Sequence, residues 1–359
     1  MLTRRDFLKL SAITFGTLAM PKLPSLQNVN NINTDTKIKL GRICAGDEGA
    51  RFELKAEPNL NASNLGYVWR DEIVEWKQEV IANQLDYNRY NQKWVETPNG
   101  YIYGPYVQPV KNLPNQPVSM LPENSDGTLG MWVEITVPVV DIKPVGNKDN
   151  TQFWIKEKNI PRIYYSQIFW AYDVRQVNGA WEYLLMQKIG AFPDSYWVDA
   201  TACRPITSEE IEPINPGIGE KHIIVDLNHH TLTCFEGKRE VFYTIITSGA
   251  KVGGKWLTPT GMHTIWRKMI STHMSSGALT GPFDLSGIGW TTLFDTNGAA
   301  IHSVYWHNDF GSPLSHGCIN CKPEDAKWIW RWSQPSVDYY PGDLINQGWG
   351  NSTLVEVIG

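Results

Sequence analysis

The sequence shows no strong excess of charge of either sign and has no long apolar run beyond its first twenty residues. Lys and Arg number 32 against 37 Asp and Glu, which gives a formal net charge of −5 and leaves no basic footprint for nucleic acid. After Met20 no stretch approaches the roughly 20 apolar residues that a membrane-spanning helix needs. The five cysteines are odd in number and scattered, which excludes a disulfide framework.

Charged residues are also scarce, at 19% of the chain, whereas 16 Trp, 22 Pro and 30 Gly are present. This composition disfavours long amphipathic helices and predicts many short strands joined by turns, hence a mainly β fold. A chain of 359 residues is long enough for two or three domains.

The N-terminus has the pattern of an export signal rather than of a folded element. Arg4 and Arg5 precede Phe7-Leu8-Lys9, and an apolar run follows from Leu10 to Met20. The paired arginines resemble a twin-arginine signal, which we place at residues 1–27. The resemblance implies export to the cell envelope, either after cleavage or with the segment kept as a membrane tether.

Two β modules are expected before the C-terminal domain. Short strand-like runs separated by Pro, Asn and Gly occupy residues 37–111. The loop Ala56–Asn59 follows the early run at Arg51–Ala56. This order resembles a bacterial SH3-like barrel, which implies either a cell-wall-binding module or a spacer. Residues 128–203 are interpreted as a second, diverged SH3-like module, and the Pro-containing segments 112–127 and 204–219 as linkers.

The strongest chemical signal is the run Ser315-His316-Gly317-Cys318-Ile319-Asn320, with His302 upstream across a loop. A thiol attacks a carbonyl as its thiolate, so a catalytic Cys318 needs a neighbour that accepts its proton. His302 ends an apolar run and is the expected general base. Gly317 permits a sharp turn, which would leave the N–H groups of residues 317 and 318 for an oxyanion.

Together with Ser248-Gly249-Ala250 and Thr258-Pro259-Thr260-Gly261, this run resembles the YkuD-type L,D-transpeptidase domain, here expected at residues 220–347. The resemblance implies a β-sandwich-like catalytic domain that acts on peptidoglycan stem peptides and needs no cofactor. It also implies covalent inhibition by carbapenem-type β-lactams. A cysteine thioester would form at the carbonyl before the terminal D-residue, and an amine of another stem, water or a protein amine would then accept the acyl group.

The resemblance also implies roles for neighbouring residues. The carbonyl of Ser303 would orient His302, and His316 would either line the site or brace the turn. His307 is a rival base on the following loop. The expected substrate-binding residues are Tyr305, Trp306, Asn320, Met274 and Trp290, with core packing as the alternative for Met274 and Trp290.

Other interpretations of the same residues remain open. Cys321 is either a small buried residue or the partner of Cys318 in a Cys-x-x-Cys pair. The histidines and cysteines near residue 318 offer metal ligands, although their spacing matches no zinc pattern. A non-catalytic, wall-binding protein is the third alternative. Cys44, Cys203 and Cys234 are expected in the core.

Overall fold

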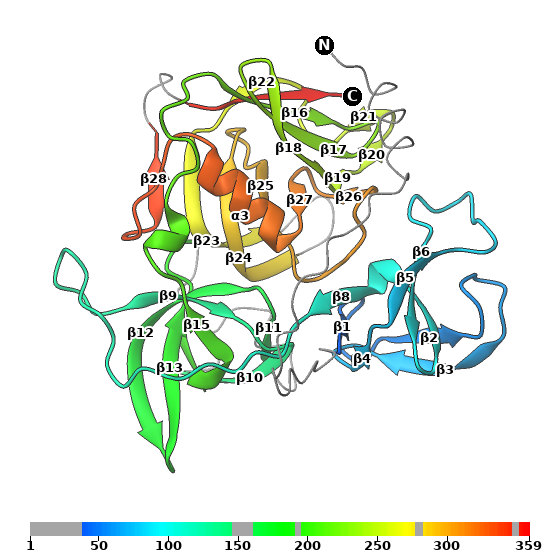
Figure 1. The fold of residues 1–359 in the computed structure, drawn as a ribbon, viewed down its shortest axis with the longest axis horizontal. Coiled ribbons are helices and arrows are strands. Elements are labelled where there is room, and N and C mark those ends of the chain that lie inside the picture. Colours follow the sequence, from blue (N-terminus) through cyan, green and yellow to red (C-terminus); the bar gives the residue numbers. More distant parts are fainter. Residues whose placement is uncertain (1–37, 146–160, 191–194, 277–282, 347–351) are drawn as a thin grey trace, which may run out of the picture. The chain divides into compact units, whose positions relative to one another are not determined.

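The computed structural model describes residues 38–145, 161–190, 195–276, 283–346 and 352–359. The expected twin-arginine signal therefore lies outside the described residues. Residues 38–359 form one compact unit that is built mainly of strands (Figure 1). No helix among the described residues is long and apolar enough to cross a membrane.

The first β module consists of a three-stranded and a five-stranded sheet, with strand orders β4-β1-β8 and β3-β2-β7-β6-β5. Its core is made by β-branched residues that alternate along the strands, such as Ile43, Val95 and Ile102, all fully buried. Its strands are β1 (Leu40–Ile43), β2 (Arg51–Lys55), β3 (Asn64–Trp69), β4 (Ile73–Glu75), β5 (Gln78–Ile81), β6 (Lys93–Thr97), β7 (Gly100–Tyr103) and β8 (Val107–Val110).

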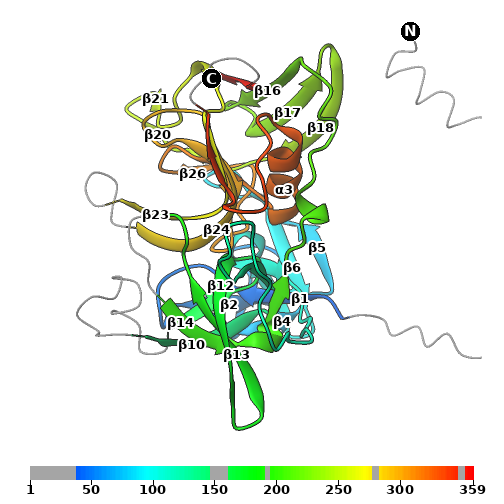
Figure 2. The ribbon, with the colours of Figure 1, turned by 90° about the vertical axis from the view of Figure 1, so that its left-hand side faces the viewer.

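The second module is one seven-stranded sheet in the order β11-β10-β14-β13-β12-β9-β15. Its longest strands, β12 and β13, pair as an antiparallel hairpin (Figure 2). The strands are β9 (Met131–Ile135), β10 (Val139–Pro144), β11 (Arg162–Tyr164), β12 (Ile168–Val177), β13 (Ala180–Met186), β14 (Ser195–Asp199) and β15 (Cys203–Pro205). β15 pairs with β9, so the segment expected to be a linker from residue 204 begins as part of this sheet.

The C-terminal domain has two five-stranded sheets with orders β18-β17-β16-β29-β22 and β27-β25-β24-β23-β28. The first contains β16 (Lys221–Asp226), β17 (Thr231–Glu236), β18 (Arg239–Ile245), β22 (Gly261–Thr264) and β29 (Leu354–Ile358). The second contains β23 (Arg267–Ser276), β24 (Phe283–Leu293), β25 (Ala300–Ser303), β27 (Ile319–Cys321) and β28 (Asp343–Ile345). Two short pairs complete the domain: β19 (Ser248–Gly249) with β26 (Pro313–Ser315), and β20 (Lys251–Val252) with β21 (Lys255–Trp256).

The last strand extends the domain beyond its expected end at residue 347. β29 lies between β16 and β22, parallel to the first and antiparallel to the second. Val355 and Val357 of β29 are buried with Ile223 and Val225 of β16. The C-terminal residues are therefore part of the core of this sheet.

A single α-helix among the described residues, α3 (Pro323–Trp332), lies against β24 and β25 (Figure 1). Pro323 opens it, where a missing N–H costs nothing, and Glu324 and Asp325 lie in its first turn, where the helix dipole favours negative charge. Ile329, Trp330 and Trp332 are buried beneath it. The helix thus covers β24 and also β25, the strand that carries His302.

Candidate active site

The turn that carries Cys318 is held by the two motif loops, Ser248–Ala250 and Thr258–Gly261. Gly249 N–H donates to Thr258 Oγ1 at 2.8 Å, and Ala250 N–H donates to Ser315 O at 2.8 Å. Gly317 has φ +140°, and a Cβ there would lie 3.1 Å from the carbonyl oxygen of Leu257. The Ser-Gly and Thr-Pro-x-Gly loops therefore form the support on which the cysteine turn rests, and glycine is required at position 317.

Cys318 lies one residue before β27, beside the strand that carries His302. β25 and β27 are parallel neighbours in which His302 pairs with Asn320, so Cys318 lies opposite Ala300. Side chains two residues apart on a strand point to the same face, and parallel neighbours are about 4.8 Å apart, so the Cα atoms of Cys318 and His302 are roughly 8 Å apart. Two side chains can span this separation, and both residues line one cavity.

His302 is a buried, neutral imidazole of fixed tautomer. Its Nδ1 lies 2.9 Å from the carbonyl oxygen of Ser303, which can only accept, so Nδ1 carries the proton and Nε2 keeps its lone pair. Burial lowers the pKa of His302 to about 4, against the small opposing effect of the Ser303 hydrogen bond. His302 therefore has the protonation state that a general base needs at neutral pH.

The thiol of Cys318 is protonated at neutral pH. Burial raises its pKa to about 11, although a hydrogen bond from the Ala300 backbone acts in the opposite direction. The Sγ contacts the carbonyl oxygen of Gly298 at 3.8 Å. Because His302 is neutral, it offers no positive charge to stabilise a thiolate in the resting protein. The arrangement thus favours proton transfer during attack over a preformed thiolate–imidazolium pair.

One expected oxyanion donor is occupied. The N–H of Gly317 donates to Ser315 Oγ at 3.1 Å, and that hydroxyl donates in turn to the carbonyl oxygen of Cys318 at 2.5 Å. The hydroxyl of Ser315 thus bridges the two ends of the turn and accepts the hydrogen bond of the Gly317 amide. The prediction that this amide points to an oxyanion is wrong for this conformation. Gly317 contributes its backbone freedom.

His307, the rival base, is bound on both ring nitrogens. Asp309 N–H donates to its Nδ1 at 3.1 Å, so the proton of the neutral ring is on Nε2, which faces the side-chain amide of Asn320 at 2.9 Å. An Nε2–H requires an acceptor, and Asn320 Oδ1 is buried without another partner among the described residues, so the amide presents its oxygen to His307. Burial, together with the nearby His302, lowers the pKa of His307 to about 3. His307 therefore holds the side chain of Asn320 in place. Its one lone pair, on Nδ1, already accepts a hydrogen bond, so it is not available to take a proton from Cys318.

The face that carries Cys318 opens into a cavity of about 810 Å³, called here the Cys318 cavity. The catalytic domain contributes Met274, Phe283, Leu314, His316 and Asn320 among others, together with the loop residues Tyr305, Trp306 and His307. Both β modules also contribute, with Cys44, Gly46, Asp47 and Arg70 from the first and Arg162, Tyr164 and Gln167 from the second.

Most of the predicted substrate-binding residues line this cavity, but Trp290 does not. Trp290 is 2% exposed and packs edge-to-face on Trp330 of α3, with ring centroids 5.4 Å apart. It belongs to the core beneath the sheet, which corrects its assignment as a wall of the substrate groove. His316 is exposed at the cavity and lies against Phe283 at 5.1 Å between centroids.

The remaining cysteines differ in their positions. Cys321 is next to Asn320 on β27, so its side chain points to the opposite face of the sheet, into the core. It is fully buried as a free thiol and does not pair with Cys318. Cys203 and Cys234 are buried likewise. Cys44 is buried but reaches the Cys318 cavity, which the sequence did not predict, and its Sγ contacts Tyr106 O at 3.3 Å. Burial raises its pKa to about 11.

The residues described here contain no group of three or more His, Cys, Asp or Glu side chains arranged to hold a metal ion. His302 and His307, which the metal alternative requires, each use Nδ1 in a hydrogen bond with a backbone group.

A cysteine on a rigid turn, beside a neutral histidine of fixed tautomer in a large cavity, is the arrangement of cysteine-dependent acyl-transfer enzymes. Residues 220–348 match the family model of the YkuD L,D-transpeptidase catalytic domain. This part of the chain is therefore a YkuD-type L,D-transpeptidase catalytic domain, as its motifs predicted. A search of the curated proteins found no match.

Solved structures of L,D-transpeptidases are similar to parts of the chain. A mutant of the Enterococcus faecium enzyme is 23% identical over 39% of this chain and 50% of its own, with a TM-score of 0.30. LdtMt1 in complex with imipenem is 16% identical over 52% of this chain and 98% of its own, with a TM-score of 0.31. The Mycobacterium smegmatis enzyme is 17% identical over 70% of this chain and 100% of its own, also at 0.31. The chain thus spans half the length of the E. faecium enzyme.

Proposed function

We propose that this protein is a cysteine-dependent L,D-transpeptidase that remodels peptidoglycan through a thioester on Cys318. The observation that carries the proposal is the placement of Cys318, one residue before β27, and His302, on the neighbouring strand β25, in one cavity of about 810 Å³. The neutral His302, with Nε2 unprotonated, supplies a base in the required state.

In the proposed first step His302 Nε2 takes the thiol proton while Cys318 Sγ bonds to the carbonyl carbon before the terminal D-residue of a tetrapeptide stem. The tetrahedral intermediate then collapses, the C–N bond breaks, and the imidazolium returns the proton to the leaving amine. In the second step an acceptor amine attacks the thioester carbonyl and loses a proton to His302. The C–S bond then breaks, and the imidazolium returns this proton to the sulfur of Cys318.

The imidazolium formed between these transfers is costly in a site that lowers the pKa of His302 to about 4. The Nδ1–H bond to Ser303 O is the contact that favours the charged ring. This cost makes the imidazolium short-lived and drives the proton onward to the leaving amine. With water as the acceptor, the same steps would give an L,D-carboxypeptidase.

We also propose that the protein acts in the cell envelope after export by a twin-arginine signal. The support is the sequence of the first 27 residues, with Arg4 and Arg5 ahead of an apolar run. Peptidoglycan stems occur outside the cytoplasmic membrane, so the proposed activity requires export, which this signal would provide.

The test is incubation of the purified protein with a tetrapeptide stem and an amine acceptor, followed by mass spectrometry of the products. We expect release of the terminal D-residue and a new amide between stem and acceptor. Cys318→Ala should abolish both products, whereas the matched control Cys203→Ala, which removes a buried thiol of the second module, should retain them. Turnover by Cys318→Ala would refute the proposal.

A further inference from the structure

Two arginines from outside the catalytic domain line the Cys318 cavity. Arg70 follows β3 in the first module, and Arg162 begins β11 in the second. Their side chains are 18% and 32% exposed, so each is partly desolvated yet open to the cavity. Tyr164, beside them, stacks on Tyr305 of the catalytic loop with ring centroids 5.8 Å apart. Both modules therefore meet the loop that follows His302.

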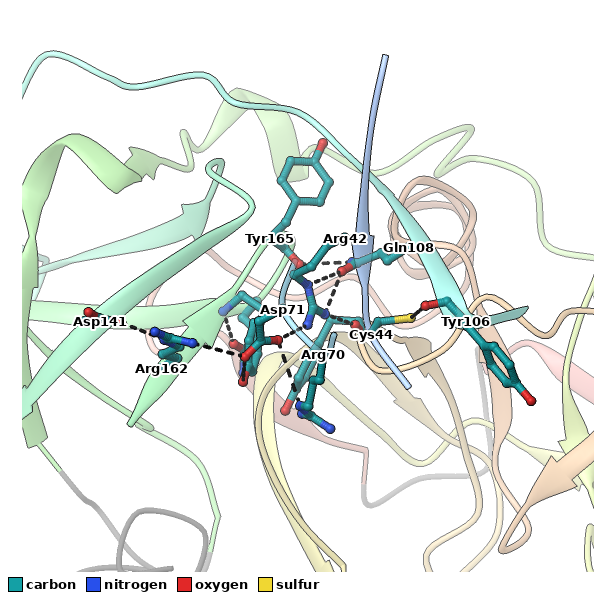
Figure 3. A network of polar contacts seen from close by, with 12 residues as sticks. Arg42, Cys44, Arg70, Asp71, Tyr106, Gln108, Asp141, Arg162 and Tyr165 are labelled. Atoms are coloured by element: carbon teal, nitrogen blue, oxygen red, sulfur yellow. Dashed lines mark hydrogen bonds and ion pairs between the residues drawn. The ribbon is translucent and has the colours of Figure 1, made fainter. Parts of the chain in front are cut away.

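The carboxylate between these arginines is already engaged. Asp71 Oδ1 accepts from Arg42 Nη1 at 2.9 Å, and its Oδ2 accepts from Tyr164 O–H at 3.2 Å. Arg70 and Arg162 approach the same carboxylate only at 3.9 Å and 3.6 Å, beyond hydrogen-bond range. Figure 3 shows Asp71 between the three arginines. Asp71 thus attracts Arg70 and Arg162 by its charge alone and accepts no hydrogen bond from either.

Positive charge exceeds negative charge in this cluster. Three guanidinium groups share two carboxylates, those of Asp71 and Asp141, and Asp141 binds Nε of Arg162 at 2.8 Å. Arg42 itself is fully buried. It also donates to the side chain of Gln108 and, at 2.5 Å, to the carbonyl oxygen of Tyr305, so it does not face the cavity. The surplus charge therefore falls on the two arginines that face the cavity.

The acidic residues that line the cavity are engaged elsewhere or face solvent. Asp284 is paired with His273, which lies in the catalytic domain, and Asp47 is exposed to solvent. A guanidinium carries five N–H donors in a planar fork that matches a carboxylate. An anionic group on a bound peptide would therefore find its best partners at Arg70 and Arg162.

We propose that Arg70 and Arg162 form a carboxylate-binding subsite that positions the substrate peptide over Cys318. The inference rests on the proposed function, because it takes the peptide in the cavity to be a stem with a free carboxylate. It assigns the two β modules a part in substrate recognition, beyond that of spacers or wall anchors. The carboxylate is either that of the terminal D-residue or one within the stem.

Binding measured without turnover tests the subsite separately from the reaction. Cys318→Ala protein is titrated calorimetrically with three stems: one unmodified, one amidated at its C-terminus and one amidated at its internal carboxylates. Arg70→Gln and Arg162→Gln are made in the same background. Arg51→Gln and Arg175→Gln remove one arginine from each module away from the cavity and serve as matched controls.

Charge-assisted hydrogen bonds give the expected size of the effect. We expect one of the two amidations to raise Kd by about 10- to 100-fold in the parent protein and in both controls. In Arg70→Gln and Arg162→Gln the same amidation should change Kd by less than about threefold. The position of the sensitive amide identifies which carboxylate is bound.

Equal amidation effects in all variants, or none in the parent, would overturn the subsite. Arg70→Lys and Arg162→Lys keep the charge and should retain part of the preference, which guards against a variant that merely misfolds. Wild-type turnover of the unmodified stem is measured in parallel. An active enzyme without the carboxylate preference refutes the subsite alone, whereas an inert enzyme refutes the proposed function.

Discussion

The acid limit of the reaction follows from the burial of His302. Its pKa is lowered from 6.5 to about 4, so at pH 5.5 about 97% of the folded protein still has a neutral base. An ordinary histidine with a pKa of about 6.5 would be only about 9% neutral at that pH. The rate of Cys318 acylation should therefore change little between pH 7 and 5.5 and fall with a midpoint near pH 4.

The measurement is the initial rate of adduct formation with a carbapenem, followed by mass spectrometry of the intact protein across this pH range. The acid limb of such a profile reports the essential base of the free enzyme. A midpoint between pH 6 and 7 would refute the assignment of a buried, neutral His302.

Stability must be followed in the same samples. The unfolded histidine binds a proton below about pH 6.5, whereas the folded one does so only near pH 4. The stabilisation from keeping His302 neutral is therefore complete above pH 6.5 and is lost as the pH falls to 4, by about 3 kcal/mol. Circular dichroism at each pH separates this loss of fold from protonation of the base.

Three further predictions concern single positions or pairs. His302→Ala should lower the acylation rate by roughly 10²–10⁴-fold, whereas His307→Ala should act mainly on stability; a larger rate loss in the second variant would exchange their roles. Arg42→Met removes one partner of a buried ion pair and should destabilise the protein by roughly 3–5 kcal/mol in urea unfolding; an unchanged midpoint would contradict this. Arg4→Lys with Arg5→Lys should retain the protein in the cytoplasm in fractionation experiments, and unchanged export would exclude a twin-arginine route.

The strands of the catalytic domain could be predicted because their signals are local. Short alternating runs such as Lys221–Asp226 (β16) and Thr231–Glu236 (β17) each form a single strand. β29 could not be predicted in the same way, because its parallel partner β16 lies more than a hundred residues away in the sequence. Register between distant strands depends on tertiary packing, which no short window contains.

The site was predictable to the same extent. The spacing of motif residues identified Cys318 and His302, yet Trp290 was placed on the wrong face because an aromatic residue in a strand fits a pocket wall and a core equally well. Arg70 and Arg162 carried no signal, since neither belongs to a motif and each comes from a separate module. Only the folded chain brings them to the same cavity as the nucleophile.

The site of the acyl adduct tests the assignment of Cys318 as the nucleophile most directly. Protein treated with a carbapenem, and separately with a tetrapeptide stem, is digested at low pH and the modified peptide is sequenced by mass spectrometry. We expect an adduct on Cys318 with both reagents, and none on Cys44, the other thiol that lines the cavity. An adduct on Cys44, or none on either thiol, would contradict this assignment.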